Sequence, residues 1–119
     1  LPAVKYKQVA KAIAKGTQFV GLSDFTAFQN AMLAKTGAIT WAGPALGEDF
    51  GAEQPDDIME ACFEDLVSGQ GEGTGWHFST ACAAANAKGR AGVWAHDAVL
   101  WGGNLAVLVS LLGTPYFQV

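Results

Sequence analysis

The pattern of apolar residues changes repeatedly along the first third of the chain, and each change predicts an element of secondary structure. Spacings of three and four indicate helices, whereas uninterrupted apolar runs between turn residues indicate short strands. The second helix places Phe25, Phe28 and Met32 on one face and ends at Gly37. The predicted order is helix, strand, helix, strand, over Val4–Lys15, Thr17–Leu22, Asp24–Lys35 and Ala38–Ala42. This alternation favours an α/β fold with a parallel sheet.

The next segment is predicted to be an acidic loop followed by a third helix. The loop runs from Gly47 to Gln54, and Pro55 can occupy the first position of the helix. Asp56 and Asp57 then lie near the positive end of the helix dipole, and Gly69 ends the last turn. We expect the apolar residues at helical spacing to be buried, and these are Ile58, Met59, Cys62, Phe63 and Leu66.

The character of the chain changes at a glycine-rich stretch, residues 69–75. This stretch follows a helix, lacks the G-x-G-x-x-G spacing and precedes no lysine of the phosphate-binding kind, so we interpret it as a linker. It divides the chain into a first unit, residues 1–68, and a second unit, residues 76–119. Strand, strand and helix are predicted in the second unit, at Trp76–Thr80, Gly92–Leu100 and Leu105–Leu112.

Composition narrows the function classes. Half of the 119 residues are hydrophobic and 15% are charged, which suits a domain with a buried core. A formal net charge of −4 gives no basic surface for nucleic acid or an anionic membrane, and Leu105–Leu112 is too short to cross a bilayer. Cys62 and Cys82 form no CxxC motif, so we expect no metal site and buried free thiols in a reducing compartment.

Ser23 is the first candidate for chemistry, because it stands where a predicted strand gives way to a predicted helix. A serine on such a corner can expose its hydroxyl beside the unpaired N–H groups of the helix start, as in a nucleophile elbow. The alternative is a helix N-cap, for which serine is also preferred. The fifth position of G-x-S-x-G is Phe25 here, and the local pattern alone favours the cap.

A nucleophilic serine needs a base, and the two histidines of the chain are not positioned for it by any local pattern. His77 lies beside Trp76 after the glycine-rich stretch, and His96 lies in a strand-like run. An ordinary surface or strand histidine is the favoured interpretation of each.

Two further segments are candidates for binding a ligand. Trp41 and Gly43 stand at the carboxyl end of a predicted parallel strand, where ligands of open α/β sheets gather, although Trp41 could equally belong to the core. Asn104 follows Gly102-Gly103 at a helix start and offers a polar side chain. A tight turn with a helix cap is the favoured interpretation of Asn104.

Three segments taken together resemble the LD-carboxypeptidase family of serine peptidases, the murein tetrapeptide carboxypeptidases, in order and spacing. They are Gly21-Leu22-Ser23-Asp24-Phe25-Thr26, Ile39-Thr40-Trp41-Ala42-Gly43-Pro44, and Leu100-Trp101-Gly102-Gly103-Asn104-Leu105 with Gly113-Thr114-Pro115. The resemblance covers essentially the whole chain. With this resemblance, the nucleophile replaces the helix cap as the favoured interpretation of Ser23.

The resemblance implies a fold, a reaction and a set of site residues. Ser23 would be the nucleophile, and the backbone N–H of Asp24 would form half of the oxyanion hole. The implied fold is a flavodoxin-like α/β domain linked to a second α/β domain. The implied enzyme is a cytoplasmic homodimer of peptidoglycan recycling that removes the terminal D-alanine from murein tetrapeptides through an acyl-enzyme, with no metal or other cofactor.

The chain also departs from the family pattern. The Glu and His of the family's Ser-Glu-His triad are expected beyond Val119, and a glycine-rich oxyanion segment is expected before Leu1. The resemblance therefore implies a central fragment, inactive alone, whose complementary chains belong to the same protein. A microcin-C-type self-immunity peptidase and a non-catalytic α/β binding module remain as alternatives.

Overall fold

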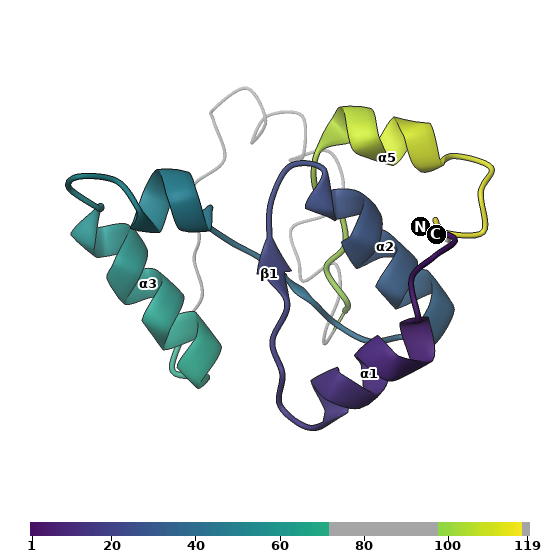
Figure 1. The fold of residues 1–119 in the computed structure, drawn as a ribbon, viewed down its shortest axis with the longest axis horizontal. Coiled ribbons are helices and arrows are strands. Elements are labelled where there is room, and N and C mark those ends of the chain that lie inside the picture. Colours follow the sequence, from purple (N-terminus) through teal and green to yellow (C-terminus); the bar gives the residue numbers. More distant parts are fainter. Residues whose placement is uncertain (72–97, 118–119) are drawn as a thin grey trace, which may run out of the picture.

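The computed structural model describes residues 1–71 and 98–117. Its helices and strands follow the predicted order in the first unit and add a short π-helix, η1 (Figure 1). The elements are α1 (Tyr6–Ala14), β1 (Val20–Gly21), α2 (Phe25–Thr36), β2 (Trp41–Ala42), η1 (Leu46–Phe50), α3 (Asp57–Ser68) and α5 (Leu105–Leu111). A mixed helical structure with a small parallel sheet is compatible with the expected α/β class.

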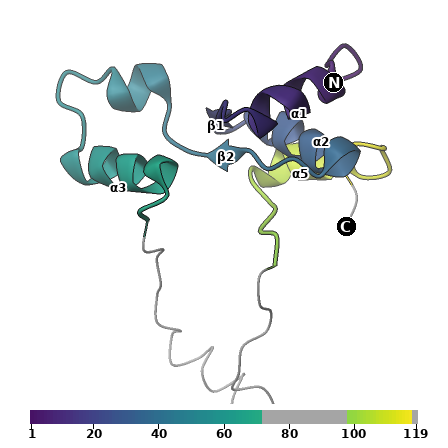
Figure 2. The same ribbon diagram turned by 90° about the horizontal axis from the view of Figure 1, so that it is seen from below.

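Helix α2 lies at the centre of a cluster of three helices, with α1 on one side and α5 on the other (Figures 1 and 2). Ala31 and Met32 of α2 are completely buried, and Leu111 of α5 is nearly so. The predicted apolar face of α2 is thus confirmed at Met32. Phe25 and Phe28, which are partly exposed, stack with their ring centroids 4.9 Å apart.

The two strands pair in parallel, as the alternation of elements predicted, with Val20 opposite Trp41 and Gly21 opposite Ala42. Hydrogen bonds from Trp41 N to Phe19 O (2.9 Å) and from Gly43 N to Gly21 O (3.2 Å) complete the pairing. Both strands are shorter than predicted. The start of the first predicted strand is exposed, and Gln18 donates a side-chain hydrogen bond to Val67 O instead of joining a ladder.

The helix ends agree closely with the sequence signals. Gly37 ends α2 in a left-handed conformation (φ 69°), and Gly69 ends α3 in the same way (φ 77°). The Asp56 carboxylate caps α3 by accepting the N–H of Met59 at 2.8 Å. Pro55 accordingly lies before the helix rather than at its first position.

The predicted burial of the apolar stripe on α3 is wrong. Ile58 is 70% exposed and Leu66 40% exposed, and Cys62 is an exposed free thiol rather than a buried one. The physical reason is the position of α3, which stands apart from the α1–α2–α5 cluster with the two strands between them (Figures 1 and 2). Its Phe63 ring does make a contact, an edge-on packing against Phe50 at 5.1 Å.

The predicted acidic loop also differs from the structure, because residues 46–50 form a π-helical turn. The N–H groups of Asp49 and Phe50 both donate to Ala45 O, at 3.1 and 3.2 Å. The Asp49 carboxylate in turn accepts the N–H of Ala45. This side-chain bond closes the turn on itself, a contribution that apolar periodicity does not reveal.

Several predictions fall outside the described residues: the strand at Trp76–Thr80, most of the linker, His77, His96 and Cys82. The strand predicted at Gly92–Leu100 is not present at residues 98–100, the part of it that is described. The division into two units at residues 69–75 stays a prediction. Among the described helices, none has the length and apolar character needed to cross a membrane.

Candidate functional site

Ser23 occupies a strained corner between β1 and α2. Its φ is +57°, which makes it the single non-glycine residue with a positive φ in residues 1–71 and 98–117. Non-glycine residues enter this left-handed region at a cost of about 1–2 kcal/mol, and such outliers cluster at functional sites. The side chain is exposed. A tight turn of three residues thus places the exposed Ser23 side chain between a strand and a helix.

The hydrogen bonds at the start of α2 do not support a capping role for Ser23. The N-cap position belongs to Asp24, and no side chain accepts a capping hydrogen bond there. Instead, the N–H groups of Phe25 and Thr26 donate to the carbonyls of Leu22 and Ser23, at 3.0 and 3.1 Å. The Ser23 hydroxyl is therefore not needed to satisfy the helix.

The backbone N–H of Asp24 has no backbone acceptor among the described residues. It lies at the amino end of α2, where the helix dipole favours negative charge. The arrangement can therefore present one hydrogen-bond donor to an anionic oxygen next to the Ser23 hydroxyl. A second donor is not identified in the described part of the chain.

Gly21 makes the tight corner possible. A Cβ atom at this position would lie only 2.5 Å from atoms of the Phe25 ring. The absence of a side chain lets the end of β1 pass directly against the first turn of α2. The requirement for glycine two residues before Ser23 thus has a steric cause in this structure.

A turn distant in sequence closes over the start of α2. Asn104 N donates to the hydroxyl of Thr26 at 2.9 Å, and Asn30 Nδ2 donates to Gly102 O at 3.1 Å. Gly103 has φ +128°, and a Cβ there would overlap the Thr26 side chain. The structure thereby brings the Gly102–Asn104 segment to the helix that begins at the Ser23 corner.

Asn104 itself caps α5, so the predicted helix cap is confirmed. Its Oδ1 atom accepts the N–H of Val107 at 3.2 Å. The side-chain oxygen is thus engaged in holding the helix, and a role of Asn104 in substrate binding stays a prediction.

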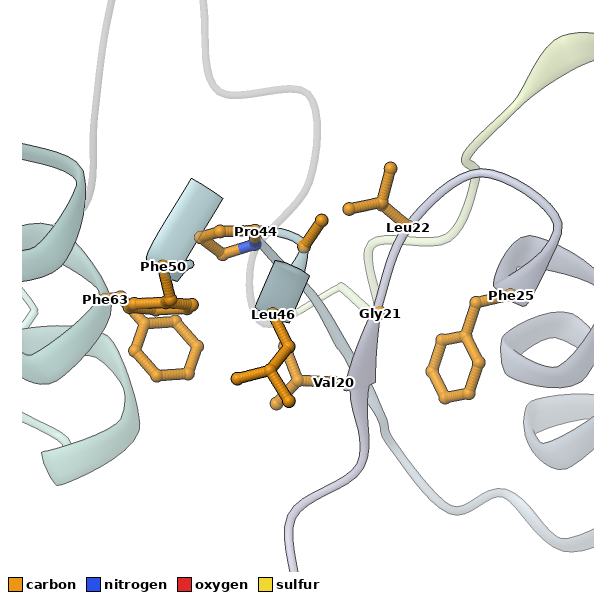
Figure 3. A pocket seen from close by; sticks show the side chains of 9 residues that line it. Val20, Gly21, Leu22, Phe25, Pro44, Leu46, Phe50 and Phe63 are labelled. Carbon is orange, nitrogen blue, oxygen red and sulfur yellow. The ribbon is translucent and has the colours of Figure 1, made fainter. Parts of the chain in front are cut away.

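An apolar groove of about 630 Å³ runs between the carboxyl ends of the two strands and the η1–α3 segment (Figure 3). Leu22, the neighbour of Ser23, lies on its wall. Of the predicted strand-end segment, Pro44 lines the groove, whereas Trp41 and Gly43 do not. The groove is lined by Val20, Gly21, Leu22, Phe25, Pro44, Ala45, Leu46, Phe50 and Phe63.

Trp41 lies in the small sheet, and Gly43 lies where a side chain would not fit. Trp41 is partly buried and pairs with Val20 across the sheet. A Cβ at Gly43 would lie 2.5 Å from Val20 Cγ1 and would also meet the Phe63 ring. Gly43 therefore allows close packing below the groove, and a role of either residue in binding substrate stays a prediction.

The described residues contain no histidine, because His77 and His96 both lie outside them. A histidine base for Ser23 is therefore not part of the site as described. The His, Cys, Asp and Glu side chains within the described ranges form no group that could hold a metal ion.

Thr26 and Asn30 are the residues of the site that sequence reasoning missed. Both are buried, at 2% and 6% exposure, on the helix face that also carries apolar residues. A signal was available, since two polar residues four positions apart interrupt the apolar pattern of α2. Buried polar groups must find partners, so this pattern indicates a docked backbone segment.

The chain is similar to a protein named probable murein peptide carboxypeptidase from Bacillus subtilis (strain 168), with 30% identity over 100 residues. This similarity covers 82% of the present chain and 28% of that protein. The chain thus spans little more than a quarter of the length of this relative. No family model matches the chain. No solved structure matches it either.

Proposed function

We propose that this chain carries the nucleophile of a serine peptidase that acts on murein peptides. The observation that supports the proposal best is the left-handed conformation of Ser23 at the β1–α2 corner. An exposed serine held at positive φ, without a capping bond, is typical of a nucleophile elbow. The similarity to a protein named as a murein peptide carboxypeptidase supports the substrate class.

In the proposed reaction, Ser23 Oγ attacks the amide carbonyl between the meso-diaminopimelate centre and the terminal D-alanine of a murein tetrapeptide. The hydroxyl proton passes through a general base to the leaving amine, and D-alanine departs. The Asp24 N–H donates to the oxyanion while the carbonyl is tetrahedral. Water then hydrolyses the resulting serine ester, which releases the tripeptide and restores the Ser23 hydroxyl.

The general base belongs, in this proposal, to a part of the native protein outside the described residues. The family resemblance leads us to expect a Glu–His pair in that role. We further propose that the enzyme works in the cytoplasm in peptidoglycan recycling, and as a homodimer. No step of the proposed reaction calls for a metal.

The test is release of D-alanine from murein tetrapeptide by the native protein that contains this chain. Ser23→Ala should abolish release while leaving the folded protein intact. Ser68→Ala is a matched control, because Ser68 is an exposed serine on α3 whose hydroxyl donates to the nearby Asp65 O. This control should leave the rate unchanged.

The outcomes separate the candidate functions. Loss of release in Ser23→Ala alone supports the murein peptidase. The native protein could instead cleave a peptide–nucleotide amide and leave the tetrapeptide intact, again only when Ser23 is present. That result would favour the microcin-C-type self-immunity peptidase. Hydrolysis that is unaffected by Ser23→Ala would contradict the proposal. A native protein that binds the tetrapeptide without hydrolysing it would favour a binding module.

A further inference from the structure

Two polar side chains are buried in the face of α2 that meets the Gly102–Asn104 turn. Thr26 is 2% exposed and Asn30 is 6% exposed, and they lie one helical turn apart. Polar side chains are retained at such depth when their hydrogen bonds are satisfied. Their partners therefore indicate what these side chains hold in place.

Thr26 is bonded to the Ser23 corner and to the distant turn at the same time. Its N–H donates to Ser23 O at 3.1 Å, and its Oγ1 atom accepts the N–H of Asn104 at 2.9 Å. Asn30 reinforces this arrangement by donating through Nδ2 to Thr26 O (2.8 Å) and to Gly102 O (3.1 Å). Ser23 is thus linked through one buried residue to a turn 78 residues away from Thr26 in sequence.

The contact between the turn and Thr26 is close as well as hydrogen-bonded. Gly103 approaches so near that an added Cβ would overlap the Thr26 hydroxyl and methyl groups. The Thr26 side chain therefore lies directly against the backbone of the turn. Strained backbone such as that of Ser23 persists when its surroundings fix it in this way.

We propose that Thr26, supported by Asn30, is a positioning residue that holds the Ser23 hydroxyl and the Asp24 N–H in their reactive geometry. This inference rests on the proposed role of Ser23 as the nucleophile. Small displacements of a reacting group lower a rate steeply while affecting substrate binding little. The effect of losing the Thr26 hydroxyl should therefore be on kcat more than on KM.

The alternative is a purely structural role, in which the Thr26 network stabilises the fold and nothing else. A matched control distinguishes the two. Thr36 lies on the same helix, and its hydroxyl also bonds to backbone, donating to Met32 O at 2.7 Å and accepting from Ala38 N at 3.3 Å. Thr36→Val thus removes a comparable hydroxyl at the other end of α2.

The experiment compares kcat and KM for D-alanine release in the native protein that contains this chain. The variants are Thr26→Val, Thr26→Ser, Asn30→Ala and Thr36→Val, with Ser23→Ala as the reference for the nucleophile. Each is assayed at a temperature where circular dichroism shows it to be folded. Asn30→Ala breaks the link to Gly102 without removing the Thr26 hydroxyl, and it decides the question if Thr26→Val does not fold.

We expect Thr26→Val to lower kcat by roughly 10- to 100-fold with KM nearly unchanged, and Thr26→Ser to restore the rate. Asn30→Ala should lower kcat in the same direction, and Thr36→Val should leave it unchanged even if it lowers the melting temperature. Folded Thr26→Val and Asn30→Ala proteins with the wild-type kcat would overturn the positioning role, while inactive Ser23→Ala would leave the proposed function standing. Active Ser23→Ala would overturn both.

Discussion

The hydroxyl oxygen of Thr26 lies 2.9 Å from the backbone nitrogen of Asn104 and accepts its hydrogen bond. This single bond joins the first turn of α2 to the turn before α5, two segments that are far apart in sequence. Thr26 is buried and the bond is partly buried, so competition from water is reduced. It explains why the Gly-Gly-Asn turn and the serine corner belong to the same part of the fold.

Thr26→Val should destabilise the protein, because valine keeps the shape of threonine but cannot accept the Asn104 N–H. The bond is partly buried, so its loss should cost about 0.5–1.5 kcal/mol of unfolding free energy. Thr26→Ser should lose less, since the hydroxyl remains. Urea unfolding of the two variants measures the difference. Equal stability of Thr26→Val and the unchanged protein would show that the bond does not form in solution.

Gly103→Ala should be more damaging than alanine at a glycine with open space around it. The substitution combines a positive φ of 128° with an overlap between the new methyl group and Thr26, and we expect a loss of about 2 kcal/mol or more. Gly47→Ala is the control, because a Cβ at Gly47 would meet nothing within 4 Å and its φ is not in the left-handed region. Melting temperatures of the two variants should differ clearly, and similar values would contradict the close approach of the turn.

Ser23 can be tested by stability alone, without any substrate. If Ser23 were a helix cap, Ser23→Ala would lower the free energy of unfolding by about 1 kcal/mol. Ser23→Gly would lower it by only a few tenths of a kcal/mol. With φ at +57° and no capping bond, we expect Ser23→Ala to be nearly neutral. Ser23→Gly should be at least as stable as Ser23→Ala, since glycine relieves the left-handed strain. A clear loss in Ser23→Ala, recovered by Ser23→Asp or Ser23→Asn, would restore the capping interpretation.

The sequence predicted more of the fold than of the site. The order of elements and the glycines that end α2 and α3 followed from apolar spacing and from the conformational freedom of glycine, both of which are local properties. The exposure of α3 could not be predicted from the sequence. An apolar stripe such as that of Ile58 and Leu66 does not specify which element packs on it. The π-helical turn depends on one carboxylate, Asp49, which bonds back to Ala45 N.

The candidate site shows the same limit. Ser23 and Gly21 could be identified from the sequence because a corner between a strand and a helix is a local feature. The docking of Gly102–Asn104 onto Thr26 and Asn30 is a long-range contact, and no local pattern pairs these segments. The polar interruption of the α2 face indicated that some partner exists, but it did not say which one.

Cys62 should react as an exposed thiol in the folded protein, contrary to the prediction from its helical stripe. A thiol-specific chromophoric disulfide should modify Cys62 in the folded protein at a rate close to that in the urea-unfolded chain. The reason is that the reagent reaches an exposed thiol without any unfolding. Comparison with Cys62→Ser assigns the reaction to this residue. Modification that requires unfolding would mean that Cys62 is covered in solution.

Tyr6 should give the stability a characteristic dependence on alkaline pH. Burial of the phenol raises the pKa of Tyr6 above its ordinary value of 10.0, and the charge of Tyr116 adds to this effect. Because the native pKa is the higher one, the neutral phenol favours folding. The corresponding stabilisation is present below pH 10.0 and is lost as the pH rises through the native pKa.

Tyr6→Phe checks this dependence, since it removes the ionisable group together with the hydrogen bond to Leu1 O. The variant should lose about 0.5–1.5 kcal/mol at neutral pH, and its stability should fall less steeply than that of the unchanged protein above about pH 10. Urea unfolding over this pH range gives both quantities. Parallel curves for the two proteins would show that Tyr6 titrates alike in the folded and unfolded states.

The role of Ser23 as the nucleophile is tested most directly by covalent labelling. The native protein that contains this chain is treated with a fluorophosphonate, which reacts with activated serine hydroxyls, and the labelled peptide is identified by mass spectrometry. We expect one phosphonyl group on Ser23, absent after unfolding and absent in Ser23→Ala. An unlabelled Ser23 in protein that releases D-alanine, or activity-linked labelling of a different serine, would contradict it.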